Sequence, residues 1–190
     1  MVNPFSLEAA AGPRGLLKSG DIAVPKGPGN SGILLLREFF DGQTPDQGRQ
    51  AWLEEHLAAD FQASFAGGKV VQSKEEFIAG CNDLLKSFPD LAFTREGPIA
   101  YNNSPNLVVW TAIVKGTHTG AAYSPKPGAK AMPSKGVAVQ NDPEKVVATF
   151  APGTGLSKLL KLTVDPLEGG KGFSGPVGFY LQVGGSASDL

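Results

Sequence analysis

Two residues of this 190-residue chain could carry acid–base chemistry. His118 lies between Thr117 and Thr119, and histidine is the side chain whose charge most readily changes near neutral pH, so it could act as a base. No carboxylate lies near His118 in the sequence to orient it, and the alternative is a histidine that hydrogen-bonds to backbone at a strand end. Asp60 follows a helical pattern, and it could be a catalytic acid or a residue that hydrogen-bonds at the helix end.

Four aromatic residues could line a pocket: Tyr101, Trp110, Tyr123 and Phe65. Tyrosine and tryptophan could supply hydrogen bonds or stacking surfaces to a ligand. Aromatic residues on strands also pack commonly into the core, so both interpretations stay open.

Metal and cofactor chemistry is not indicated. The chain has one cysteine, Cys81, and two histidines, which excludes a cysteine-cluster zinc site and leaves few ligands for any other, so we expect no metal and no cofactor. The pair Gly67-Gly68 lacks the lysine and hydroxyl spacing of a phosphate loop.

Charge and hydropathy also exclude several partners. With 17 Lys and Arg against 18 Asp and Glu, the net charge of −1 argues against nucleic-acid binding. No apolar run approaches the roughly 18 residues of a membrane span. The features of a secretory signal are absent, so we expect a soluble, intracellular or organellar protein.

The elements that must position these residues are helices followed by strands. Ser73-Lys74-Glu75-Glu76 has the pattern of a capping box, and the apolar residues behind it predict a helix over 73–88. Helices are also predicted at 46–58 and 33–40. Turn signals predict three hairpins, formed by 61–65 with 70–71, 91–101 with 107–119, and 132–140 with 145–150. This order indicates an α+β fold in which a strongly bent antiparallel sheet wraps around about three helices.

Glycine and proline are unusually abundant, with 25 and 15 residues, and they gather at the two ends of the chain. We therefore expect an extended N-terminal arm at 1–32, a domain at 33–164, and a Gly/Pro-rich C-terminal extension at 165–190. The one apolar run of this extension, Val177–Val183, predicts a short strand.

Several segments together resemble the NTF2-like superfamily, over about residues 46–152. They are Leu57–Phe61, Ala66–Gly68 and Ser87–Leu91, and then Val108–Thr111 leading into Gly116–Gly120, which resembles the SnoaL-like (polyketide cyclase-like) branch. The resemblance implies a cone-shaped α+β barrel with an apolar pocket, and often a homodimer. It also implies a catalytic acid on the strand after the loop that follows Gly116–Gly120.

The spacing of this sequence puts Ala138 or Val137 at the acid's position, and Phe65 at the position of the aspartate of ketosteroid-isomerase relatives. None of these side chains can transfer a proton. The first hypothesis is therefore a protein that binds an apolar or aromatic small molecule without the family's recognisable acid. The alternatives are a non-catalytic accessory or structural subunit of a larger assembly that uses its terminal arms, and a cyclase- or isomerase-like enzyme that uses His118.

Overall fold

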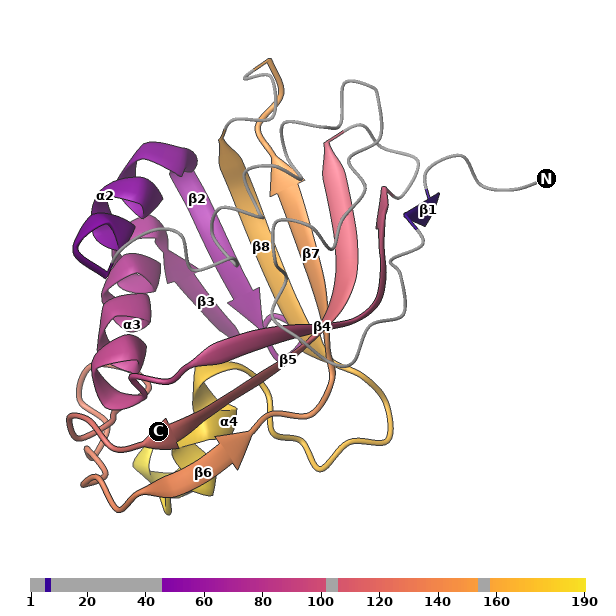
Figure 1. Cartoon of the computed structure of the whole chain (residues 1–190). Helices are drawn as coiled ribbons and strands as arrows, with labels where there is room; N and C mark the ends of the chain where they lie inside the picture. Colours follow the sequence, from indigo (N-terminus) through magenta and orange to yellow (C-terminus); the bar gives the residue numbers. More distant parts are fainter. Residues whose placement is uncertain (1–5, 8–45, 102–105, 154–157) are drawn as a thin grey trace.

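The computed structural model describes residues 6–7, 46–101, 106–153 and 158–190 (Figure 1). Its helices are α2 (Asp46–His56), α3 (Lys74–Ser87), α4 (Gly175–Gln182) and a short 3-10 helix, η1 (Ala187–Asp189). Its strands are β1 (Ser6–Leu7), β2 (Leu57–Phe65), β3 (Val70–Ser73), β4 (Ala92–Tyr101), β5 (Leu107–His118), β6 (Val137–Gln140), β7 (Glu144–Phe150) and β8 (Leu159–Pro166). The predicted α+β class with three α-helices is confirmed.

The strands form one curled sheet in the order β1-β4-β5-β7-β8-β2-β3. This path has two ends, so the sheet is open and does not close into a barrel. The expectation of a wholly antiparallel sheet is wrong, because β2 and β8 run parallel. Two parallel strands need a long connection along the chain. Here the connection from β2 to β8 contains α3 and the strands β3 to β7.

The predicted hairpin of 132–140 with 145–150 does not form. Instead β6 and β7 both pair with β5, one after the other along the same edge. At the junction the backbone N–H of Asn141 donates to Val114 O at 2.9 Å. The twelve-residue β5 is long enough to pair with both strands, so the residues at 141–143 act as a kink and not as a reversing turn.

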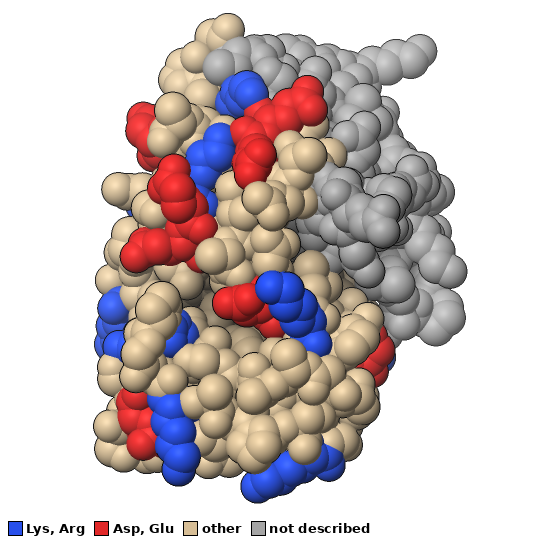
Figure 2. Space-filling model, turned by 90° about the vertical axis from the view of Figure 1, so that its left-hand side faces the viewer, with Lys and Arg blue, Asp and Glu red and all other residues tan. Residues whose placement is uncertain are grey.

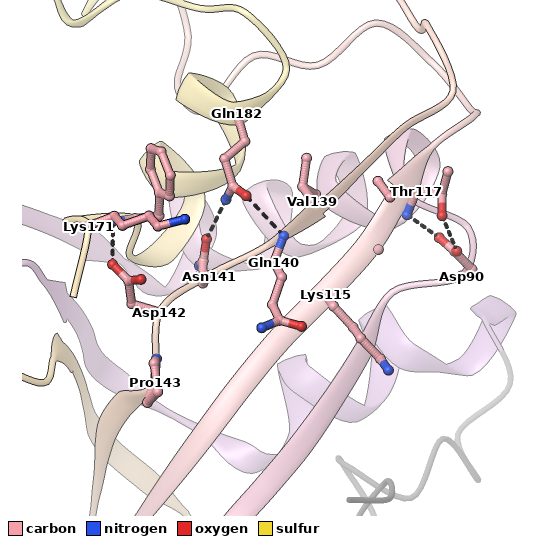
Figure 3. Close-up of a pocket in the computed structure, with 13 residues that line it drawn as sticks. Asp90, Lys115, Thr117, Val139, Gln140, Asn141, Asp142, Pro143, Lys171 and Gln182 are labelled. Atoms are coloured by element: carbon pink, nitrogen blue, oxygen red, sulfur yellow. Dashed lines mark hydrogen bonds between the residues drawn. The ribbon is translucent and has the colours of Figure 1, made fainter.

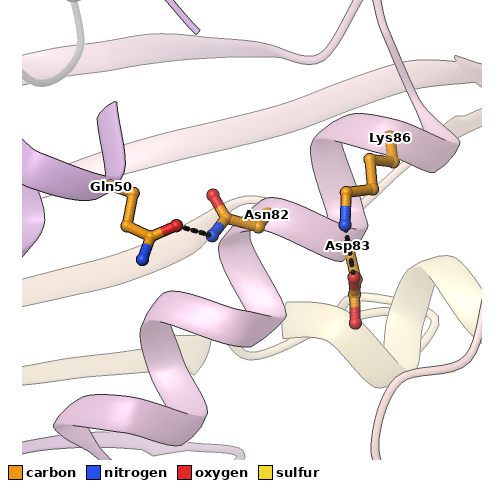
Figure 4. A network of polar contacts seen from close by, with 4 residues as sticks. All are labelled: Gln50, Asn82, Asp83 and Lys86. Carbon is orange, nitrogen blue, oxygen red and sulfur yellow. Dashed lines mark hydrogen bonds and ion pairs between the residues drawn. The ribbon is translucent and has the colours of Figure 1, made fainter. Parts of the chain in front are cut away.

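The helix predicted at 73–88 is confirmed. Ser73 is its N-cap: Ser73 Oγ accepts from the N–H of Glu76 at 3.3 Å, and Glu76 Oε2 accepts from the N–H of Ser73 at 2.8 Å. A hydrogen bond of 3.4 Å from Asn82 Nδ2 to Gln50 Oε1 joins α3 to α2 (Figure 4). The helix predicted at 46–58 ends at His56 and runs directly into β2, and the helix predicted at 33–40 lies outside the described residues.

The C-terminal run Val177–Val183 belongs to a helix and its C-cap, not to the predicted strand. Pro176 occupies the first turn of α4, where its missing N–H costs nothing. Phe179, Tyr180 and Val183 are then spaced as on one face of a helix, and all three are at most 3% exposed. Of the predicted N-terminal arm, only Ser6–Leu7 is described, and it pairs with β4.

The buried apolar side chains form two clusters. The larger lies between α2, α3 and the strands β2, β5, β7 and β8. The smaller joins α4 to Phe88, Tyr123 and Val139, and Phe93 packs against both clusters. None of the helices in the described ranges has the length and apolar content needed to cross a membrane.

Candidate functional site

An internal cavity of about 100 Å³, partly open to solvent and lined in part by half-buried residues such as Gln72 and Leu84, lies where the two clusters meet. Its walls come from α3, from the concave side of the sheet and from α4. Most of the lining is apolar and includes Phe65, Phe77, Phe93, Val146, Leu162 and Phe179. Phe65, one of the four aromatic residues singled out in the sequence, thus lies in the wall of this cavity. The face of the molecule that carries α2 and α3 is hollowed near its centre, and acidic and basic side chains are interspersed on it (Figure 2).

Glu144, the first residue of β7, brings a carboxyl group into this apolar lining. It is 1% exposed. Its Oε1 accepts from Gly175 N–H at 2.6 Å and from Ser174 Oγ at 2.7 Å, with a longer contact to Asn141 Nδ2 at 3.4 Å. These bonds all go to one oxygen. The other oxygen, Oε2, makes no hydrogen bond within the described part of the chain.

Burial raises the pKa of the Glu144 carboxyl above its ordinary value of 4.5. The hydrogen bonds from Gly175, Ser174 and Asn141 oppose this shift, and the neighbouring charge of Asp142 adds to it. The upward direction follows because an ionised carboxylate loses water on burial, and no cation is among the causes that act on it. The neutral acid has an O–H donor that the carboxylate lacks.

Sequence reasoning missed Glu144, although a signal was present. Glu144, Val146, Ala148 and Phe150 occupy every second position of β7, and all four are buried on the same face of the strand. The alternation therefore marks Glu144 as inward-facing. Its position after Asn141-Asp142-Pro143 indicated a turn instead.

The residues at the expected position of the acid lie elsewhere. Ala138 is exposed and lines a groove on the outside of the molecule, and Val137 begins β6 at the far end of β5. Glu144 stands beyond the kink and pairs with Ala112 of β5. Glu144 thus lies on the next strand along the chain, β7, and not on β6, where Val137 and Ala138 lie.

His118 is fully buried and lines neither the cavity nor the groove. Its ring stacks on Phe88 with the ring centres 4.9 Å apart, and its Nε2 lies 2.9 Å from Ala121 O. Nδ1 has no hydrogen-bond partner among the described residues. Asp60 is exposed on β2, where the pairing with β8 is irregular, and it also lines neither site.

The other aromatic residues occupy the core. Trp110 is 3% exposed in the larger cluster, and Tyr123 is 2% exposed in the smaller one. Tyr123 Oη donates to Pro176 O at 3.0 Å, and burial raises the pKa of Tyr123. Neither residue lines the cavity. The side chain of Tyr101 lies outside the described residues.

A larger and more polar groove, of about 630 Å³, lies over β5, β6 and the segment that leads into α4 (Figure 3). Its carboxylates are engaged in structural bonds. Asp90 accepts from the Thr117 hydroxyl at 2.7 Å and the Thr117 N–H at 2.6 Å, which lowers the pKa of Asp90, and Asp142 accepts from Phe173 N–H at 2.9 Å. Its lysines, Lys115 and Lys171, are exposed.

The internal cavity is the better candidate site despite its smaller size. Ligand sites combine an apolar enclosure with a few directed polar groups, and Glu144 supplies such a group. In the outer groove, by contrast, the charged groups are bonded to backbone or solvated. Asn141 lines both spaces and separates them. It bonds to Glu144 and to Gly175 O on the side of the cavity, and to Gln182 on the side of the groove (the last bond is drawn in Figure 3).

The chain has the NTF2-like fold in its SnoaL-like form. It resembles a candidate SnoaL-like polyketide cyclase from Jannaschia sp. CCS1 with a TM-score of 0.57 and 17% identity, over 80% of this chain and 91% of that one. The candidate hydroxylase AclR from Streptomyces galilaeus gives a TM-score of 0.56 and 14% identity, over 80% of each chain. A candidate polyketide cyclase from Xanthomonas campestris gives a TM-score of 0.52 and 12% identity, over 83% of this chain and 99% of that one.

No protein-family model and no curated protein sequence matches the chain. At identities this low, the likeness to solved structures establishes the fold and not the activity.

Proposed function

We propose that the internal cavity binds a small, mostly apolar molecule that carries one hydrogen-bond acceptor, and that Glu144 in its neutral acid form donates to that acceptor. The observation that carries this proposal is the carboxyl group of Glu144 in the apolar lining of the cavity, where Ser174 and Gly175 donate to Oε1 and no group of the described residues donates to Oε2. In the neutral acid the O–H group is then available to donate to a ligand oxygen at hydrogen-bond distance.

The structural neighbours support a ligand of this kind. Two of those compared are candidate polyketide cyclases, and the ketone oxygens of polyketides are acceptors in a largely apolar framework. The cavity has the same chemical character, with one carboxyl group among phenylalanine, valine and leucine side chains.

Calorimetric titration with cyclohexanone, compared with methylcyclohexane, tests the proposal. We expect cyclohexanone to bind more tightly by about tenfold, the equivalent of a hydrogen bond of about 1.4 kcal/mol. The preference should fall as the pH rises through the pKa of Glu144, because the carboxylate cannot donate. Equal affinity for the two molecules at every pH would overturn the proposed role of Glu144.

Glu144→Gln is the matched variant. The amide oxygen can still accept from Ser174 and Gly175, and the amide nitrogen then presents a donor to the cavity at every pH. The variant should therefore bind cyclohexanone without the pH dependence of the wild type. Cys81, the only cysteine, lines the cavity, so protection of Cys81 from N-ethylmaleimide by the ligand reports where the ligand binds.

Proton transfer by Glu144 is the second candidate function, and the position of this carboxyl group in the lining of the cavity favours it. In its ionised form the carboxylate would take a proton from the carbon beside a ligand carbonyl: the O–H bond forms as the C–H bond breaks, and an enolate remains. In D2O the reverse step returns a deuteron. Proton NMR of cyclohexanone should then show exchange catalysed by the wild type and none with Glu144→Gln, and equal rates would contradict it.

Association as a homodimer, or as an accessory subunit in a larger assembly, stays a separate prediction. Sedimentation of the full chain, alone and after isolation from native extract, tests it. A monomer with no stable partner would contradict both forms of association.

A further inference from the structure

Helix α4 closes one end of the internal cavity. Gly175, Pro176 and Phe179 belong to its lining, and Phe179 is the only one of the three with a large side chain. Phe179 is 1% exposed, and its ring stands edge-on to Phe88 with the ring centres 4.9 Å apart. This wall comes from the C-terminal extension, which lies outside the 46–152 region that carries the sequence resemblance.

The wall is held from several directions. At the start of α4, Glu144 accepts from Ser174 and Gly175, while Asn141 Nδ2 donates to Gly175 O at 3.1 Å. The hydroxyl of Tyr123 donates to Pro176 O.

The far end of α4 is tied as well. The hydroxyl of Tyr180, in the last turn of α4, donates to Lys130 O at 2.8 Å, and the N–H of Gln140 donates to Gln182 Oε1 at 3.0 Å. Moving α4 to make room for a larger ligand would break the buried bond of Ser174 at one end and the partly buried bond of Tyr180 at the other, and a buried donor left without a partner costs about 1–3 kcal/mol.

The volume then limits the ligand. A cavity of about 150 Å³ lined by apolar side chains holds benzene, and this cavity is about 100 Å³. Since this cavity is smaller than the one that holds benzene, a single six-membered ring is an upper bound on the ligand and would already fill the space, and two fused rings exceed it. A charged ligand would lose its hydration against the phenylalanine and valine side chains, so a neutral molecule is favoured.

We infer that α4 restricts the site to a neutral molecule no larger than one six-membered ring with a single oxygen acceptor, and that Phe179 sets this limit. The inference rests on the proposed function, since it names the ligand class of the same cavity. With this limit the site does not admit multi-ring substrates. The opposite walls of the cavity belong to the larger cluster and to the sheet, so replacing their side chains would disturb the core. The side chain of Phe179, by contrast, makes none of the hydrogen bonds that hold α4, so it can be shortened without altering them.

Titration of the full chain with cyclohexanone and with the bicyclic ketone 1-tetralone tests the limit. The wild type should bind 1-tetralone more weakly than cyclohexanone by at least about tenfold. Phe179→Ala removes most of the side chain, and it should bring 1-tetralone to within about threefold of cyclohexanone. Phe150→Ala is the matched control: Phe150 is fully buried in the larger cluster and does not line the cavity, so the size limit should not change.

Phe179→Leu, with 4-methylcyclohexanone as the larger ligand, replaces the alanine variant if that variant does not fold. The leucine variant should bind 4-methylcyclohexanone at least about threefold more tightly than the wild type does. Unchanged size selection in both Phe179 variants would overturn the inference. Equal binding of cyclohexanone and 1-tetralone by the wild type would overturn it while the proposed function stands, and binding of neither ketone would overturn both.

Discussion

Replacement of Glu144 tests whether this carboxyl group holds α4 against the sheet. Glu144→Ala removes the acceptor for Ser174 Oγ and for the N–H of Gly175, and Ser174 is only 7% exposed. A buried donor left without a partner costs about 1–3 kcal/mol, so the two together cost about 2–6 kcal/mol. Water that enters the enlarged cavity would recover part of this cost, so we expect a loss of about 2–5 kcal/mol. Such a loss is a large fraction of the stability of an ordinary domain, about 5–15 kcal/mol.

Glu144→Gln is the control, because the amide oxygen keeps both acceptor contacts. Its free energy of unfolding should stay within about 1 kcal/mol of the wild type. Urea unfolding at pH 6 gives the stabilities, and hydrogen exchange at Gly178 and Val183, whose N–H groups bond within α4, reports whether that helix loosens first. The reasoning would be refuted if the alanine variant were as stable as the wild type, or if the glutamine variant were as unstable as the alanine variant.

The same variants report the protonation of Glu144. Because burial raises its pKa in the folded protein above the ordinary 4.5, the folded state binds the proton more tightly than the unfolded state. This contribution to stability is fully present below pH 4.5, and it is lost as the pH rises through the raised pKa. Glu144→Gln has no such loss, so its stability relative to the wild type should increase over this range. A stability difference that is independent of pH would contradict the raised pKa.

Four further perturbations have definite expected outcomes. Ser73→Ala should lower the free energy of unfolding by about 1 kcal/mol, because it removes the N-cap of α3; an unchanged melting temperature would contradict the role of the cap. Gly80→Ala, inside α3, should raise stability by about 1 kcal/mol in the same assay, because the added Cβ would meet its nearest neighbour, Gln72 Nε2, at an ordinary 3.8 Å. His118→Leu should leave the affinity for cyclohexanone within about twofold, since His118 does not line the cavity, whereas a tenfold loss would show that His118 takes part in the site. Deleting 167–190 removes Phe179, Tyr180 and Val183 from the smaller cluster, and burial of each of these side chains contributes about 1.5–3 kcal/mol. Circular dichroism of the shortened chain should therefore show no cooperative thermal transition. A melting temperature like that of the full chain would show that α4 is dispensable.

Much of the fold could be predicted because the signals are local. The capping box at Ser73 and the apolar stripe behind it define α3 from neighbouring residues alone. The segments of the NTF2-like resemblance correctly indicated the superfamily fold and its SnoaL-like form. The C-terminal run was mistaken for a strand because it is apolar throughout, and a short apolar run has no period that separates helix from strand.

The site could be predicted only in part. Phe65 lies in the wall of the cavity, but His118 and Asp60 lie away from it, and Glu144 was not recognised. Pairing of β6 and β7 with a single long strand cannot be inferred from turn residues, because a kink and a hairpin turn use the same residue types. Without that pairing, nothing in the sequence places Glu144 opposite Ala112.

The sequence by itself determined the class of the fold, the helix that begins at Ser73, and a net charge too balanced for nucleic acid, because propensity, capping and composition act over a few residues or over the whole chain. Only the tertiary structure decided that Glu144 is an inward acid at an apolar cavity and that α4 closes it. Glu144 and Gly175 are 31 residues apart, and the bond between them exists only when the sheet has curled and the C-terminal helix has docked. The raised pKa of the carboxyl and its place in the apolar lining of the cavity both follow from that burial, which is a property of packing and not of any local pattern.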